Sequence, residues 1–293
     1  MVKLRLLLIG CCALIIAGCG SGGGEFVPPN GSVPPPPSTS GTYLRVDLTT
    51  KQLVPTSSTA PAGANEIAFR EILTGETRVS TADSVTGTGT ATGAALGAAP
   101  VGRHYLGLTE VTQSQWQSLV AASGTGVTST PWTSGAFANA SGATLPVCNV
   151  TQVQIATVLE AWNNKSSYRL RLPTGTEWEN ACRAGSAGTW SWGNDARTSV
   201  AGNFALVQET GTGIGSAAGA APVASRSANA WGFYDLHGNV WEWVSNGGVS
   251  NAPCLRGGSW SDSLNSAQSG NRLDLPTNVP FPLAGLRLVL ETR

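Results

Sequence analysis

Cysteine and histidine are the side chains best suited to nucleophilic or soft-metal chemistry, and this chain of 293 residues has six cysteines and two histidines. The histidines, His104 and His237, are far apart, no cysteines have CxxC spacing, and no Cys–His pattern typical of zinc occurs. Cys148, Cys182 and Cys254 lie in the part expected to fold, so at most one disulfide can form there. The spacing leaves open whether Cys148 and Cys254 are joined.

His237 is the histidine with an acid close by, because Asp235 precedes it by two residues in the stretch DLHG. A Ser–His–Asp hydrolase site could be built on this pair, but a triad depends on a geometry that two neighbours on one loop supply poorly. We therefore interpret His237 as a packing or surface histidine.

Composition argues against one class of partner and indicates an exported protein. The 17 basic residues balance 17 acidic ones, and no basic patch is visible, which argues against nucleic acid as a partner. Hydrophobic residues make up 41% of the chain, enough for a sizeable core. The 37 glycines, 17 prolines and 10 tryptophans are typical of a loop-rich exported protein rather than a cytosolic helical enzyme.

The first residues resemble an export signal. Lys3 and Arg5 form a positive start, and residues 6–17 form an apolar run too short to span a bilayer. The sequence Ile-Ala-Gly-Cys then resembles the lipobox of bacterial lipoproteins, which predicts that Cys19 carries lipid. This resemblance implies a lipid-anchored protein of the bacterial cell envelope, with the outer membrane favoured over the inner. An ordinary cleavable signal in which Cys19 is incidental is the alternative.

These features divide the chain into three parts. Residues 1–18 are the predicted signal peptide, and residues 19–41 are a Gly- and Pro-rich tether that cannot bury a core. Residues 42–293 are expected to form the folded domain.

The domain is expected to be α+β, with few helices and many loops. Short hydrophobic alternation predicts strands at residues 43–47, 66–72 and 285–291, whereas residues 80–100 have little to pack and are expected to form a loop. Three capping boxes, each a Thr followed three residues later by Gln or Glu, predict helix starts. They begin at Thr112, Thr151 and Thr174.

Four motifs occur in order along the chain. They are EVTQSQW at 110–116, RLPTGTEWENACRAG at 171–185, GFYDLHGNVWEW at 232–243, and LRGGSW at 255–260 with a closing GLRLV at 285–289. Together they resemble the formylglycine-generating-enzyme, or sulfatase-modifying-factor, family over nearly two-thirds of the chain. The resemblance implies a C-type-lectin-like fold, loop-rich with few helices and small antiparallel sheets.

The large side chains of these motifs are expected to be structural. Four tryptophans should fill the core, three arginines should brace loops through their several donors, and one cysteine should be a small buried hydrophobe. They are Trp178, Trp241, Trp243, Trp260, Arg171, Arg256, Arg287 and Cys182.

The resemblance also locates a departure from the family. The enzymes carry a copper-binding Cys pair after the Gly-Gly-Ser-aromatic motif, and the matching positions here are Asp262 and Ala267. Without a thiolate pair no copper is expected, and no iron is expected because the family's iron-dependent branch needs a His cluster and this chain has only His104 and His237, in unrelated motifs. We therefore interpret the protein as non-catalytic. The alternatives are a formylglycine-generating-type oxidoreductase of sulfatase maturation that works without the usual Cys pair, and an accessory or sensor subunit of an envelope complex.

A calcium site in the loop DLHGNVWE is a further implication of the resemblance. Position by position, it gives Asp235 and Glu242 as side-chain ligands and Gly238 and Val240 as carbonyl ligands. Oxygen ligands of this kind suit a hard cation such as Ca²⁺ rather than zinc. The alternative is that the two acids merely cap the loop through hydrogen bonds.

Residues 261–284 lie between the frames RGGSW and GLRLV, which resemble those of variable proteins made by diversity-generating retroelements. That resemblance implies an exposed binding face on a rigid scaffold, as in an antibody. The stretch 273–284 fits a loop surface, because its Leu, Phe and Pro follow neither strand nor helix period. An invariant family member is the alternative. We expect the following residues to bind an unidentified protein or surface ligand: Ser261, Asp262, Ser263, Asn265, Leu273, Asp274, Leu275, Asn278 and Phe281.

Overall fold

The computed structural model describes residues 42–57, 62–73, 79–80, 96–97, 103–133, 141–211, 219–247 and 251–292. The signal peptide, Cys19 and tether that the sequence predicts lie outside these residues, as does most of the loop expected at 80–100. Among the described residues, no helix combines the length and the apolar character needed to cross a membrane.

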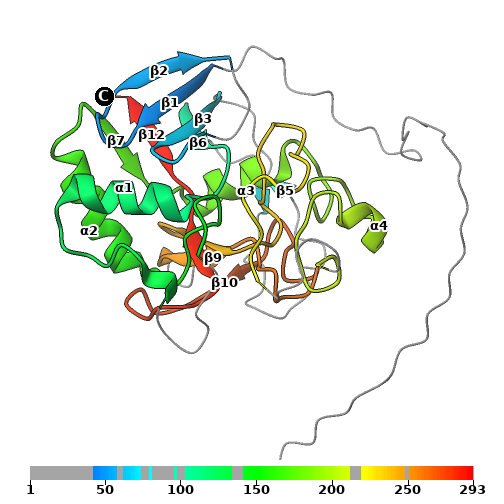
Figure 1. The fold of residues 1–293 in the computed structure, drawn as a ribbon. Coiled ribbons are helices and arrows are strands. Elements are labelled where there is room, and N and C mark those ends of the chain that lie inside the picture. Colours follow the sequence, from blue (N-terminus) through cyan, green and yellow to red (C-terminus); the bar gives the residue numbers. More distant parts are fainter. Residues whose placement is uncertain are drawn as a thin grey trace, which may run out of the picture. The chain divides into compact units, whose positions relative to one another are not determined.

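The main sheet has six antiparallel strands in the order β2-β1-β3-β6-β12-β7. Their bounds are β1 Tyr43–Asp47, β2 Leu53–Thr56, β3 Glu66–Ile72, β6 His104–Gly107, β7 Tyr168–Arg171 and β12 Val289–Thr292. β12 lies between β6 and β7, so it joins β7 to the other four strands of this sheet (Figure 1).

A second sheet of four strands has the order β10-β9-β8-β11. Its bounds are β8 Trp241–Val244, β9 Cys254–Arg256, β10 Arg272–Leu273 and β11 Ala284–Leu286. β11 pairs with β8 in parallel, and the other two pairings are antiparallel. Two short strands, β4 Val79–Ser80 and β5 Leu96–Gly97, form a separate antiparallel pair.

All three predicted capping boxes are confirmed. Thr112, Thr151 and Thr174 begin the helices α1 Gln113–Ser123, α2 Gln152–Asn163 and α3 Gly175–Arg183. In each box the Thr hydroxyl accepts from the backbone N–H three residues on, and the Gln or Glu side chain accepts from the Thr N–H. Losing such a cap costs about 1 kcal/mol. The short helices η1 Pro131–Thr133 and α4 Thr198–Ala201 complete the described helical structure.

Helices cover both faces of the main sheet. α1 and α2 lie side by side (Figure 1), and their apolar residues form one core with alternate residues of β1 and β3. α3 forms a second core with Ala68, Ile72 and Leu106. The predicted strand at 66–72 is confirmed, but six of its seven residues are buried. Side chains on one face of the strand pack in the first core and those on the other face in the second, so neither face meets solvent.

The single strand expected at residues 285–291 is wrong. The structure has two strands there, β11 in the second sheet and β12 in the main sheet, separated by Arg287 and Leu288. The Arg287 side chain is fully buried and binds groups of both sheets, so the chain leaves one sheet at this residue and enters the other.

The structural roles expected for the motif side chains are largely confirmed. Trp178, Trp241 and Trp243 are at most 1% exposed, although Trp260 is only half-buried. The Trp243 indole donates to the Val150 carbonyl at 2.9 Å, which removes the penalty of burying an unpaired N–H group. Cys182 is fully buried, as expected.

Gly285 is expected to be the least tolerant of substitution of the described β11 residues. A Cβ atom there would lie 2.2 Å from the Val147 carbonyl oxygen, inside any allowed contact with rigid backbone. We predict that Gly285→Ala lowers the free energy of unfolding, measured in urea, by more than about 2 kcal/mol. Gly63→Ala is the control, because its Cβ meets nothing within 4 Å; equal stability of the two variants would contradict this packing.

Candidate functional site

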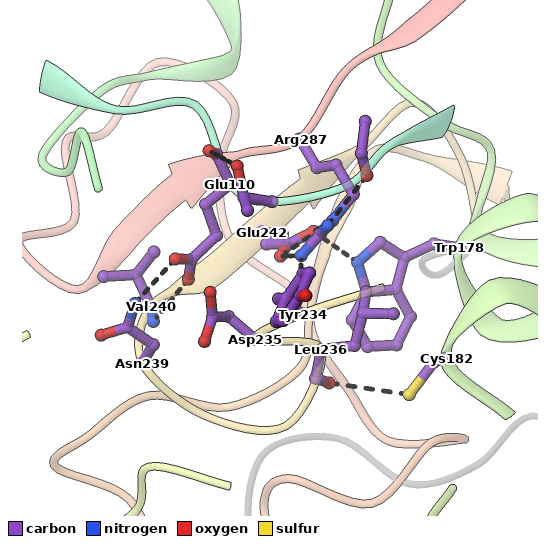
Figure 2. A network of polar contacts seen from close by, with 12 residues as sticks. Glu110, Trp178, Cys182, Tyr234, Asp235, Leu236, Asn239, Val240, Glu242 and Arg287 are labelled. Atoms are coloured by element: carbon purple, nitrogen blue, oxygen red, sulfur yellow. Dashed lines mark hydrogen bonds and ion pairs between the residues drawn. The ribbon is translucent and has the colours of Figure 1, made fainter. Parts of the chain in front are cut away.

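A cluster of three buried carboxylates and one arginine lies where the two sheets meet (Figure 2). Glu242 comes from β8, Arg287 from the passage between β11 and β12, Asp235 from the loop before β8, and Glu110 from the residues before α1. All four side chains are at most 5% exposed. Their charges can therefore be balanced only by one another, by protons or by a cation.

Glu242 is saturated by protein donors. Its Oε1 accepts from Arg287 Nη2 at 2.8 Å, and its Oε2 accepts from Trp178 Nε1 at 2.6 Å and from Arg287 Nε at 3.1 Å. Arg287 also donates to the carbonyls of Gly107 and Tyr234, at 2.9 and 2.7 Å. Burial opposes the Arg287 charge, but the neighbouring Glu242 carboxylate raises the arginine pKa above its ordinary value.

Glu110 and Asp235 form the second half of the cluster, and their carboxylates point toward each other in Figure 2. Glu110 accepts from Val240 N at 3.1 Å and from Asn239 Nδ2 at 2.7 Å, while Asp235 accepts from Ala224 N at 2.6 Å. Burial raises the pKa of Glu110 well above its ordinary value, and Asp235 raises it further. Burial likewise raises the pKa of Asp235 to about 6.

The loop that carries Asp235 has a constrained backbone. Asp235, Gly238 and Asn239 have φ values of 58°, 91° and 61°, in the left-handed region that costs most residues energy. Glycine is required at 238, because a Cβ there would lie 2.0 Å from the Leu206 carbonyl oxygen. Leu206 N–H donates to the His237 carbonyl, and Asn239 N–H donates to the Leu206 carbonyl. These bonds hold the loop against residue 206.

One of the four expected calcium ligands, Glu242, is already occupied by protein donors. Glu242 is fully used by Arg287 and Trp178, which leaves Asp235 with the carbonyls of Gly238 and Val240. Ca²⁺ takes six to eight oxygen ligands. Among the described residues, no group of three or more His, Cys, Asp or Glu side chains is arranged to hold a metal ion. Of the two acids, only Asp235 accepts from a backbone N–H, that of Ala224, whereas Glu242 accepts from the side chains of Arg287 and Trp178.

None of the nine residues expected on the binding face is buried. Ser261, Asn265 and Asn278 are exposed, and the other six are half-buried. Residues 266–272, between the two parts of the face, are all buried. Leu273, Leu275 and Phe281 rest partly on the main core.

Asp262, one of the nine, is held by hydrogen bonds. Its Oδ2 accepts from Trp241 Nε1 at 2.8 Å, from the Ser259 N–H at 3.0 Å, and from the Ser259 hydroxyl. The Trp241 backbone N–H donates to the Leu283 carbonyl at 2.8 Å. Trp241 therefore contacts both ends of the segment 261–284.

The second family Cys position, Ala267, is fully buried next to His237. His237 Nδ1 is 2.7 Å from the Ala267 carbonyl, which assigns it as the donor, and the Ser191 N–H donates to Nε2 at 3.2 Å. Burial lowers the pKa of His237 to about 4, so the ring is neutral at physiological pH. The packing interpretation of His237 is confirmed, and Cys182 Sγ lies 3.5 Å from its Nε2.

The three described cysteines, Cys148, Cys182 and Cys254, are free and buried, which answers the question of a Cys148–Cys254 bridge. Burial raises their thiol pKa values to about 12, 12 and 11. Almost no thiolate, the reactive form of cysteine, is present at neutral pH.

Residues 66–292 match the Sulfatase-modifying factor enzyme 1-like domain. The chain belongs to this family. Mouse inactive C-alpha-formylglycine-generating enzyme 2 is 34% identical over 129 residues, which cover 40% of this chain and 41% of that protein. The formylglycine-generating enzyme of Mycobacterium tuberculosis is 35% identical over 82 residues, covering 26% of each. The chain thus spans well under half the length of these relatives.

Solved structures confirm the expected fold of the family. Treponema denticola variable protein 1 superposes with a TM-score of 0.60 at 22% identity, covering 76% of this chain and 95% of that one. PvdO from Pseudomonas aeruginosa gives a TM-score of 0.61 at 21% identity, covering 80% and 95%. At these identities the likeness concerns the fold alone.

The sequence did not indicate the contacts that build the acid cluster. Glu110 and Asn239 were visible inside family motifs, but no role was expected for either, and Arg287 was expected to brace loops without a stated partner. Glu110 stands two residues before the capping Thr112 and is the only charged residue of the motif EVTQSQW. That position, together with the acids Asp235 and Glu242 in the later motif at 232–243, is the signal that could have indicated Glu110. The pairing of Glu242 with Arg287 joins residues 45 apart in sequence.

Asp235 offers a test of whether this cluster holds protons or a cation. Its raised pKa means that the folded state binds a proton more tightly than the unfolded one, so its contribution to stability is lost as pH rises from about 4 through 6. Asparagine removes the charge and keeps an oxygen for the Ala224 N–H. We predict that Asp235→Asn stabilises the protein by about 1–3 kcal/mol at pH 7 and changes little at pH 4.

Urea unfolding at both pH values, with and without excess EDTA, measures this effect. Destabilisation by Asp235→Asn at pH 7 that disappears in EDTA would instead mean that Asp235 ligates a divalent cation.

Proposed function

We propose that this protein is a lipid-anchored, non-catalytic binding protein of the bacterial cell envelope, which presents the face 261–281 to a protein or surface ligand. The observation that carries the proposal is that Asp262 replaces a cysteine of the family's enzymes and is held by hydrogen bonds. Where the family's enzymes have their first copper-binding cysteine, this chain has a carboxylate held by Trp241 and Ser259. The same position, itself one of the nine face residues, is fixed by hydrogen bonds rather than free for thiol chemistry.

The thiol chemistry of the chain supports the same conclusion. A formylglycine-generating reaction of the usual kind needs reactive thiolates, and burial keeps the three described cysteines protonated. The curated relatives include proteins named as inactive forms, which supports loss of catalysis within the family.

We further propose that residues 261–284 are diversified. The frames on either side are mostly buried, at residues 255–259 and 284–289, whereas the nine face residues are exposed or half-buried. Accessible residues between fixed frames are what a diversified binding surface requires, and here they lie in two stretches, 261–265 and 273–281, on either side of the buried residues 266–272. The name of the structural neighbour, variable protein 1, supports this reading of the fold.

Residue tolerance tests the display of this face. Combined Ser261→Ala, Asn265→Ala and Asn278→Ala changes should leave the free energy of unfolding within about 0.5 kcal/mol, because exposed side chains contribute little. Ala267→Asn, in the buried middle of the same segment, is the matched control and should cost more than about 2 kcal/mol. Comparable losses in the two variants would mean that the whole segment is core.

Oxidation of a Cys-x-Pro-x-Arg peptide by the wild-type chain with added copper would overturn the non-catalytic proposal.

The anchor has its own test. Wild-type protein expressed in a bacterium should partition into the detergent phase and carry acyl mass on Cys19. The Cys19→Ser variant should be released or remain unprocessed, because a serine cannot form the thioether to lipid. A soluble wild-type mature form that begins at another residue would refute the anchor.

A further inference from the structure

Glu209 borders the first stretch of the proposed binding face, residues 261–265, although it lies outside the segment 261–284. Its Oε2 accepts from the Leu264 N–H at 2.9 Å, and its neighbour Gln208 donates through the backbone N–H to the Asp262 carbonyl at 2.8 Å. Glu209 is exposed. A ligand on the first stretch therefore meets the Glu209 carboxylate as well.

The carboxylates of Asp262 and Glu209 are held by neutral donors. Asp262 Oδ2 accepts from the Trp241 indole and from the Ser259 N–H and hydroxyl, and Glu209 accepts from a backbone N–H. No ion pair joins either carboxylate to an Arg, Lys or His of the described residues, and neither Asp262 Oδ1 nor Glu209 Oε1 accepts a hydrogen bond from them. The first stretch thus carries fixed negative charge that the described protein does not balance.

The second stretch, residues 273–281, has an apolar surface that extends onto α2. Four large hydrophobic side chains of the described residues are exposed, and two of them, Val153 at 47% and Val279 at 46%, lie here. The Val153 N–H donates to the Thr277 carbonyl at 3.2 Å, which places the first turn of α2 against this stretch. The acid of the stretch, Asp274, is paired with an arginine at 3.3 Å, so this end of the face has no unbalanced charge.

We propose that the ligand of the face is a protein segment that combines basic with apolar side chains, and that Glu209 and Val153 belong to its site. The basic groups lie against the carboxylates of the first stretch, and the apolar groups against Val153 and Val279. Buried apolar surface supplies affinity, whereas complementary charge selects the partner and speeds association. A membrane surface is excluded as the ligand, because the first stretch repels anionic headgroups. The proposal rests on the proposed function, since it requires that the face binds a ligand.

A phage library of random short peptides, panned against immobilised full-length protein that has been washed free of detergent micelles, tests this partner class. Enriched peptides should contain more Lys and Arg than Asp and Glu, and more Leu, Ile and Phe than the unselected library. Failure to enrich any peptide, or enrichment of acidic ones, overturns the proposal. Stronger binding of the protein to phosphatidylserine than to phosphatidylcholine vesicles also overturns it, because a lipid anchor would insert into both.

The affinity of an enriched peptide, measured by fluorescence anisotropy, tests the individual contacts. Glu209→Gln with Asp262→Asn keeps the hydrogen-bond acceptors and removes both charges. These changes should weaken binding about three- to tenfold at low salt and remove most of its salt dependence. Val153→Ser with Val279→Ser should weaken binding by at least about tenfold at any salt concentration, because apolar area is lost from the contact.

Asp47→Asn with Val54→Ser is the matched control. Asp47 is also a half-buried carboxylate held by backbone N–H groups, those of Thr49 and Thr50, and Val54 is 53% exposed. Both lie on the hairpin of β1 and β2 at the edge of the main sheet. The control should leave the affinity within about twofold, since a distant exposed charge is largely screened.

Equal weakening by this control, or unchanged affinity in the Glu209 and Val153 variants, overturns the proposal. The combined Ser261→Ala, Asn265→Ala and Asn278→Ala variant separates this failure from failure of the proposed function. Peptides that the combined variant binds as tightly as the wild type would show that the face itself is wrong. A melting temperature for each variant shows that the fold is intact.

Discussion

The buried ion pair between Glu242 and Arg287 is the contact on which the arrangement of the two sheets depends. Glu242 belongs to the second sheet, and Arg287 lies where the chain passes from that sheet to the main one. The same guanidinium binds the carbonyl of Gly107 at the end of β6. Removing one partner of such a pair leaves an unpaired buried charge and costs about 3–5 kcal/mol, a large share of the stability of a domain. The pair fixes where strands β8, β11 and β12 can lie, which an apolar contact of similar size would not specify.

Arginine side chains also fix the loops, by donating hydrogen bonds to backbone carbonyls. Arg256 holds the carbonyls of Gly270 and Asn271, and Arg226 holds those of Gly202 and Thr210. Loop carbonyls have no strand partner, so they are costly to bury unless a side chain donates to them. In a chain with few long helices, these planar donors replace the hydrogen-bond ladders that regular elements provide.

The parts of the structure that follow local rules could be predicted from the sequence, and the parts set by distant contacts could not. The helix starts at Thr112, Thr151 and Thr174 depend on atoms three residues apart, so sequence alone was enough. The break at Arg287 was missed because residues 285–291 alternate without interruption, and only the position of Glu242, in another strand, shows why Arg287 points inward. The same contact occupies one of the four expected calcium ligands. Its residue type makes Glu242 a good metal ligand, but its carboxylate is already paired with Arg287.

The two stretches of the proposed binding face are anchored separately, and this decides how variation could be tolerated. The first stretch, 261–265, is held by Trp241 through Asp262, and by the loop at 208–209, since Gln208 N–H donates to the Asp262 carbonyl and Glu209 accepts from the Leu264 N–H. The second stretch, 273–281, leans on the main core and on α2, where the Val153 N–H donates to the Thr277 carbonyl. Between them the buried residues 266–272 are held by Arg256 and by the contact of Ala267 with His237. A change in one stretch is therefore separated from the other by packed structure. That separation suits a surface whose parts change independently, whereas a catalytic site needs its residues fixed relative to one another within a fraction of an ångström.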